Sequence, residues 1–127
     1  MSDYRVKTGT DVALVSLTVL DPQPRSEGIK AKRRTYAASA KVRDEGRYLE
    51  LLWSLVQDED MYQDILNEFG VLTELTAAVT VYARDETFAY VRMNGIACRP
   101  MPGNEVKWSN SFPRDIMILV RNLTPAS

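Results

Sequence analysis

The chain has 127 residues, of which 45% are hydrophobic and 26% charged, and its formal net charge is -1. It contains no histidine and a single cysteine, Cys98. A Ser–His–Asp or Cys–His catalytic site is therefore excluded, and so is a zinc site built on histidine or on several cysteines. The length and composition indicate one globular domain spanning residues 1–127, and the near-neutral charge argues against a dedicated nucleic-acid binder.

The first quarter of the chain is expected to hold one strand between two irregular segments. Residues 1–10 are polar and are expected to form a flexible N-terminal segment. Asp11–Leu20 is rich in β-branched and aliphatic residues, which favour a strand. The prolines at 22 and 24 end it because proline cannot donate to a ladder. Residues 21–34 are then expected to form an extended loop or arm.

The segment Lys32–Trp53 predicts a long hairpin with its basic arm near one end. Arg43–Gly46 is a turn signal within it, since Gly46 can adopt a positive φ. Arg47–Trp53 alternates in the period-2 pattern of a strand.

Asp58–Phe69 predicts the one helix of the chain. Met61, Ile65 and Phe69 recur every four residues and form an apolar stripe that should pack against the sheet. Gly70 follows directly and is typical of the residue after a helix.

The last third is expected to be β-structure. Its predicted strands are Ala77–Arg84, Phe88–Cys98, Glu105–Trp108 and Asp115–Asn122, and Asn94-Gly95 is a strong hairpin signal inside the second of them. The element order predicts a mainly β fold, a β-sandwich or partly closed barrel, with one flanking α-helix and a long hairpin or loop arm.

The sequence assigns no catalytic residue, metal or cofactor. Asp58, Glu59 and Asp60 are clustered, but a helix N-cap and first turn account for them. Cys98 has no histidine to act as its base and is expected to be a buried, inert thiol. Neither the P-loop nor the dinucleotide fingerprint is present. The chain is therefore expected not to be an enzyme.

The densest group of like charges comprises Lys30, Lys32, Arg33 and Arg34. Three interpretations are open: contact with nucleic-acid phosphates, an ion-pair surface for a protein partner, or a solvated loop. The outer face of the predicted helix carries the opposite charge at Asp64 and Glu68. A basic arm and an acidic face on one chain suit head-to-tail contacts, which close into rings when the rotation permits. These six residues are expected to contact other subunits.

Trp108 and Phe112 are two further candidates for subunit contacts. They lie in the polar loop predicted between two chain breaks. Aromatic residues in such a loop can anchor an interface or fold back over the core as a lid, and the sequence leaves both alternatives open.

Several segments together resemble the small structural proteins of bacteriophage tails, which include tube, distal-tail and head–tail joining proteins. The resemblance covers Arg33–Leu123 and is one of element order and style rather than of a single motif. The segments are Arg34–Tyr36, Glu45–Tyr48, Val79–Asp85, Asn94–Ala97 and Pro113–Leu123.

This resemblance implies a virion structural subunit that assembles into a ring with copies of itself and contacts other virion proteins. The subunit would lie in a phage tail or at a tail, baseplate or head–tail junction, and it would be assembled in the host cytoplasm. Separately, no apolar run approaches the roughly 18 residues of a membrane span, so no membrane partner is expected, and the near-neutral net charge argues against nucleic acid. The alternative is a small cytoplasmic binding or accessory module that acts as a monomer or dimer.

Overall fold

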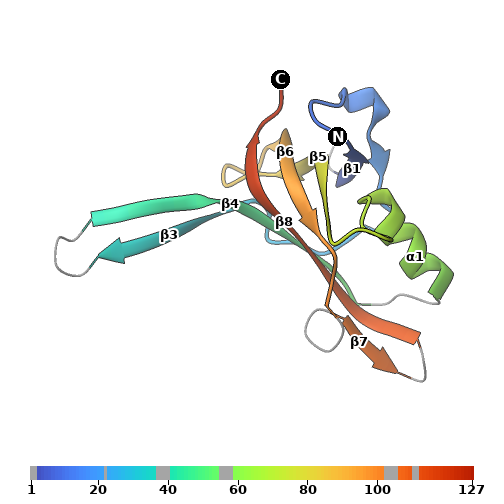
Figure 1. Cartoon of the computed structure of the whole chain (residues 1–127). Helices are drawn as coiled ribbons and strands as arrows, with labels where there is room; N and C mark the ends of the chain where they lie inside the picture. The colour runs from blue at the N-terminus through green and yellow to red at the C-terminus, as the bar shows by residue number, and fades with distance from the viewer. Residues whose placement is uncertain (1–2, 22, 37–40, 55–58, 102–105, 110–111) are drawn as a thin grey trace.

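The computed structural model describes residues 3–21, 23–36, 41–54, 59–101, 106–109 and 112–127, and for residues 32–45 and 107–114 no side chain is described. Within these described residues, eight strands, one short 3-10 helix and one α-helix follow one another along the chain (Figure 1). Their bounds are β1 (Arg5–Thr8), η1 (Leu14–Ser16), β2 (Thr18–Val19), β3 (Lys30–Tyr36), β4 (Lys41–Trp53), α1 (Glu59–Glu68), β5 (Thr76–Arg84), β6 (Tyr90–Cys98), β7 (Val106–Ser109) and β8 (Phe112–Pro125).

All the strands belong to one antiparallel sheet. Its order is β2-β1-β5-β6-β8-β4-β3, and β7 pairs with the first part of β8. Within the described residues, the end strands β2 and β3 do not pair with each other, so the sheet is not closed. The predicted mainly β fold with one flanking helix and a long hairpin is confirmed, and Figure 1 shows the β3–β4 hairpin extending away from the body of the molecule.

The chain after β2 connects the two sides of this open sheet. The N–H of Leu20 donates to the carbonyl of Tyr4, beside β1, at 3.1 Å. Farther along, Arg25 and Leu52 of β4 exchange two backbone hydrogen bonds of 2.7 and 2.9 Å. The connection therefore satisfies backbone groups of strands that lie far apart in the sheet order.

One face of the curved sheet forms the hydrophobic core. Alternate residues of β4 and β8 point into it, because successive side chains of a strand lie on opposite faces. The two strands contribute directly paired residues to this face, and all of them are buried: Leu49 with Val120, Leu51 with Ile118, and Trp53 with Ile116. The helix supplies the other side of the core, where the rings of Trp53 and Phe69 meet edge to face with centroids 6.1 Å apart.

The predicted helix is confirmed over Glu59–Glu68; Asp58 lies outside the described residues. Ile65 and Leu66 are buried against the core. The helix ends in a Schellman motif, in which the N–H of Val71 bonds to the carbonyl of Leu66 and Gly70 adopts a φ of +72°. Glycine is suited to this place because it has no Cβ to oppose a positive φ.

Two predictions for the N-terminal region are wrong. Arg5–Thr8 is not a loose tail but strand β1, whose Val6 is fully buried. Asp11–Leu20 is not one strand, since only Thr18–Val19 pairs with β1. The chain must reverse between β1 and β2 for these strands to run antiparallel. Several of the β-branched residues that suggested a strand lie in this reversal.

The turn predicted at Arg43–Gly46 is also wrong, because these residues lie inside β4. Arg33 pairs with Asp44 while Ala31 pairs with Arg47, so β4 carries one extra residue there. This extra residue is a β-bulge, and Gly46 has the positive φ, +104°, that such bulges use. The extended arm predicted for residues 21–34 likewise stops before Lys30, where β3 begins.

The hairpin signal at Asn94-Gly95 marks a different feature, since both residues lie in the middle of β6. The turn between β5 and β6 is formed instead around Asp85, whose Oδ1 accepts the N–H of Thr87 at 2.8 Å. Gly95 is required by packing: a Cβ there would lie 2.6 Å from Leu123 Cδ2 and 2.7 Å from Val120 Cγ1.

We expect Ile65→Ala to destabilise the protein by about 2–5 kcal/mol, because it removes a large side chain that is only 4% exposed. Urea unfolding followed by circular dichroism would measure this loss. Gln63→Ala, on the exposed side of the same helix, is the control and should change the free energy of unfolding by less than about 0.5 kcal/mol.

Gly95→Ala should cost roughly 1–3 kcal/mol, the range for inserting a methyl group into a packed core. Unfolding of the double variant with Leu123→Ala tests the cause, because truncating Leu123 removes one of the two close contacts. The two losses should then add up to more than the loss in the double variant. Strict additivity would show that the contact with Leu123 is not what excludes alanine.

Candidate assembly surfaces

The β3–β4 hairpin becomes a two-stranded arm where β4 leaves β8. Residues Tyr48–Trp53 of β4 pair with β8, whereas residues 41–47 pair with β3 alone. Within the described part of the chain, no third strand covers either edge of this arm. Each edge therefore presents backbone N–H and C=O groups that another chain could pair with.

All four predicted basic contact residues lie in β3. Lys30, at the base of the arm, forms an ion pair with Glu27. This hydrogen-bonded contact lowers the pKa of the Glu27 carboxyl and raises the pKa of the Lys30 ammonium. The charge of Lys30 is thus partly compensated within the chain. Lys32, Arg33 and Arg34 lie farther along the arm, and their side chains are outside the described part.

The two predicted acidic residues, Asp64 and Glu68, lie on the side of α1 that borders β2. Together with the segment Thr18–Asp21 they line a surface groove of about 270 Å³. This groove also includes Asp21, which the sequence placed in the predicted loop or arm of residues 21–34. Its proximity to the helix depends on the pairing of β2 with β1, and no sequence pattern indicated that pairing.

A polar clamp holds the segment that leads to β2. Asn94 Nδ2 donates to Asp11 Oδ1 at 2.6 Å, and the backbone N–H of Ser127 donates to the same oxygen at 2.8 Å. Thr80, which is fully buried, donates to the carbonyl of Gly9 at 2.9 Å. The hydrogen bond from Asn94 and then that from Ser127 hold the pKa of Asp11 below its usual value.

Trp108 and Phe112 are not in a loop, because they lie in the hairpin formed by β7 and β8. Trp108 pairs with Pro113, and Ser109 pairs with Phe112. Their side chains fall outside the described part of the structure, so the choice between interface anchor and lid stays open.

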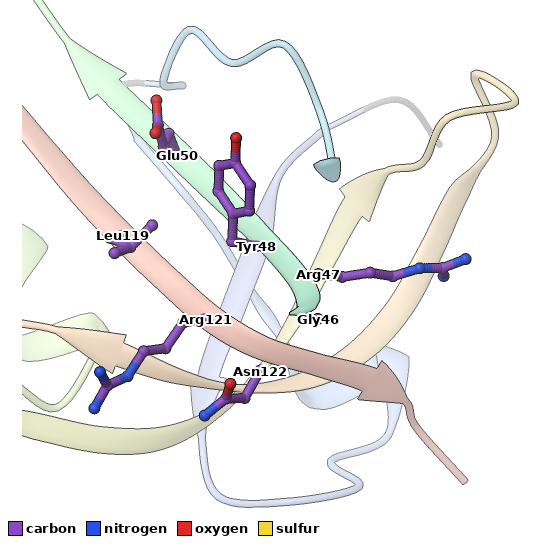
Figure 2. A pocket seen from close by; sticks show the side chains of 7 residues that line it. All are labelled: Gly46, Arg47, Tyr48, Glu50, Leu119, Arg121 and Asn122. Atoms are coloured by element: carbon purple, nitrogen blue, oxygen red, sulfur yellow. The ribbon is translucent and has the colours of Figure 1, made fainter. Parts of the chain in front are cut away.

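A surface pocket of about 530 Å³ lies where the arm joins the body. Figure 2 shows that Tyr48 and Glu50 project from β4 and Arg121 from β8, whereas Arg47 points away from them. Arg47 instead approaches Glu86, with 3.8 Å between Nη2 and Oε2. The charged groups around this pocket do not converge on one point, so it does not have the arrangement of a catalytic centre.

The sequence reading missed an exposed aromatic residue, Phe88, at the turn between β5 and β6. Its side chain is 77% exposed and its φ is +66°, which is unfavourable for a bulky residue. The guanidinium of Arg84 lies 5.5 Å from the ring centroid, in cation–π range. Phe88 lines a further surface pocket with Lys30 and Tyr48, so it lies near the base of the arm.

The remaining chemical candidates stay isolated. Cys98 is half-buried rather than buried, with its Sγ 4.0 Å from the carbonyl of Ile96. Glu59 and Asp60 are exposed in the first turn of α1. Among the residues that the structure describes, no group of three Cys, Asp or Glu side chains could hold a metal ion.

Comparison with protein-family models, with curated proteins and with solved structures gave no match. Among the described residues, no helix is both long and apolar enough to cross a membrane.

The lowered pKa of Asp11 in the clamp leads to a prediction of how the free energy of unfolding depends on pH. A carboxyl group whose pKa is lowered by folding stabilises the protein above its unfolded pKa, here about 3.8, and this contribution disappears as the pH falls through the lowered value. Asp11→Asn keeps an oxygen acceptor but cannot titrate. Between about pH 5 and pH 2, the free energy of unfolding should therefore fall less in this variant than in the wild type. Equal losses in urea titrations at the two pH values would contradict the assigned role of Asp11.

Proposed function

We propose that the chain is a non-enzymatic structural subunit of a virion, which forms a ring with copies of itself in a phage tail or at a tail, baseplate or head–tail junction. The observation that carries the proposal is the two-stranded arm, whose β4 segment 41–47 pairs only with β3. The arm reaches away from the hydrophobic core (Figure 1).

An arm of this kind gains little stability from its own chain. An isolated two-stranded hairpin is marginally stable in water, because it buries little apolar surface. Strands β3 and β4 nevertheless run for 7 and 13 residues. A neighbouring subunit would cover the arm and pair with its edges, which accounts for a long hairpin better than a role as an isolated monomer does.

The charge distribution favours a protein neighbour over nucleic acid. Residues 30–36 and 41–47 carry seven Lys and Arg against two acidic residues, although the whole chain has a net charge of -1. The compensating acidic residues therefore lie elsewhere on the same chain. A dedicated nucleic-acid binder would show an overall basic excess.

The resemblance of Arg33–Leu123 to phage tail proteins supplies the biological setting of the proposal. It implies a β-fold with a flanking helix, ring assembly, and contacts made partly by a long hairpin. The mainly β fold, the helix and the hairpin are all present in the chain. The virion, the ring and the other virion proteins remain the proposed part.

Replacing Lys30, Lys32, Arg33 and Arg34 by serine should weaken self-association without unfolding the subunit. These residues lie in β3, at the end of the sheet order, so we expect the circular dichroism spectrum and melting temperature to change little. Sedimentation velocity and negative-stain electron microscopy would measure the assembly state. The matched control replaces four exposed basic residues elsewhere, namely Lys7, Arg25, Arg99 and Arg121.

Three outcomes would contradict the proposal. Unchanged assembly of the arm variant would remove the arm from the interface. Wild-type affinity for DNA that falls steeply with salt would favour a nucleic-acid partner. A wild-type chain that stays monomeric and captures one host protein would favour the alternative, a small binding or accessory module.

A further inference from the structure

The groove between β2 and α1 is a second unfilled surface of the molecule. It is lined by Thr18–Asp21 on one side and by residues of α1 on the other, and it contains three acidic residues but no basic one. Among the described residues, none forms an ion pair with Asp21, Asp64 or Glu68. The groove thus carries negative charge that no described ion pair compensates.

The β2 side of this groove is also a free sheet edge. In an antiparallel pair, successive residues point their N–H and C=O groups alternately toward and away from the partner strand. Leu20 donates to Tyr4 on the β1 side, at 3.1 Å, so the backbone groups of the preceding residue, Val19, point away from β1. The side chain of Val19 is 43% exposed. An incoming extended segment would find both hydrogen-bonding groups and apolar surface here.

The same chain carries a segment with the complementary properties. Strand β3 is extended, its outer edge has no partner among the described residues, and its sequence Lys-Ala-Lys-Arg-Arg-Thr-Tyr contains four basic residues and no acidic one. It lies at the end of the sheet opposite to β2. Because β2 and β3 occupy opposite ends of the strand order, contact between two copies through these edges would be head to tail.

We propose that the groove between β2 and α1 receives the β3 strand of a second copy of this chain. The inference rests on the proposed structural role and names the surface through which the copies join. The β3 backbone pairs with the free edge at Val19, and the positive charge of β3 on the face turned toward α1 lies against the carboxylates of Asp21, Asp64 and Glu68. Each copy gives one arm and receives one, so the contact is heterologous and propagates to a ring.

Reversing the charge of the groove tests the proposal. Asp64→Lys with Glu68→Lys replaces two carboxylates on the surface of α1, neither of which is buried. Self-association, measured by sedimentation equilibrium, should weaken at least tenfold, because like charges then face the arm. The matched control, Glu59→Lys with Glu74→Lys, makes the same change in charge at exposed positions outside the groove and should associate as the wild type does.

A mixing experiment distinguishes head-to-tail contact from any other charge effect. An arm variant with Lys32→Glu, Arg33→Glu and Arg34→Glu keeps its groove, and the groove variant keeps its arm. Each variant alone should be a monomer, whereas an equimolar mixture should reassemble with the two variants alternating, because the unchanged arm fits the unchanged groove and the reversed arm fits the reversed groove. Combining all five substitutions in one chain should restore assembly, because the two charge signs are then exchanged.

The outcomes separate this inference from the proposed function. If the wild type assembles and the groove variant assembles equally well, the groove is not the receptor, while the structural role stands. If the mixture does not assemble although each variant is folded and monomeric, the head-to-tail pairing is wrong. If the wild type stays monomeric up to millimolar concentration, both proposals fall.

Discussion

The structure depends on the pairing of β4 with β8. Six consecutive residues of β4, Tyr48–Trp53, pair with residues of β8, and every second pair is a contact between large apolar side chains in the core. Shifting this pairing by one residue would turn all of these side chains to the opposite face. The burial of Leu49, Leu51 and Trp53 therefore sets the register of the sheet, and it also sets the point at which β4 leaves the body.

Beyond that point the same strand continues with a different environment. Tyr48 is the first residue of β4 to pair with β8, and the bulge at Gly46 lies two residues before it in the chain. A bulge bends a strand and increases its local twist. The bulge therefore lies at the junction, where it can direct the arm away from the core. Rigid pairing on one side and a free ribbon on the other are thus built into one continuous strand.

The period-2 and helical patterns predicted the elements whose stability comes from burial. The stripe of Met61, Ile65 and Phe69 identified the helix, and the alternation of apolar residues identified β5, β6 and β8 to within a few residues. The signals that depend on backbone conformation were ambiguous. Gly46 and the Asn94-Gly95 pair both look like turns in the sequence, yet one forms a bulge and the other lets Leu123 and Val120 approach β6 closely. A glycine shows that a side chain is unwanted, and only the tertiary structure shows why.

Charge alone identified the candidate contact residues in the sequence, but it did not show which of them lie together in the fold. The basic cluster appeared because its members are adjacent in the chain. Asp21 joins Asp64 and Glu68 only because β2 pairs with β1 beside the helix, a long-range contact that no local pattern reports. Phe88 was predicted to begin a strand, but β6 begins at Tyr90, because the sequence around a single aromatic residue does not separate a turn from the start of a strand.

A net charge near zero takes on a different meaning once the charges are placed in the fold. Fourteen residues of the arm include seven of the sixteen basic residues of the chain. The groove lies at the other end of the sheet order, and all of its charged residues are acidic. In the proposed assembly, the arm of one copy would attract the groove of the next, whereas arms would repel arms and grooves would repel grooves. Electrostatic complementarity of this kind sets orientation and register more than affinity. In the proposed assembly, backbone pairing at the free edges would supply the remaining affinity, and both the unpaired arm and the open edge at β2 would be covered by neighbouring copies.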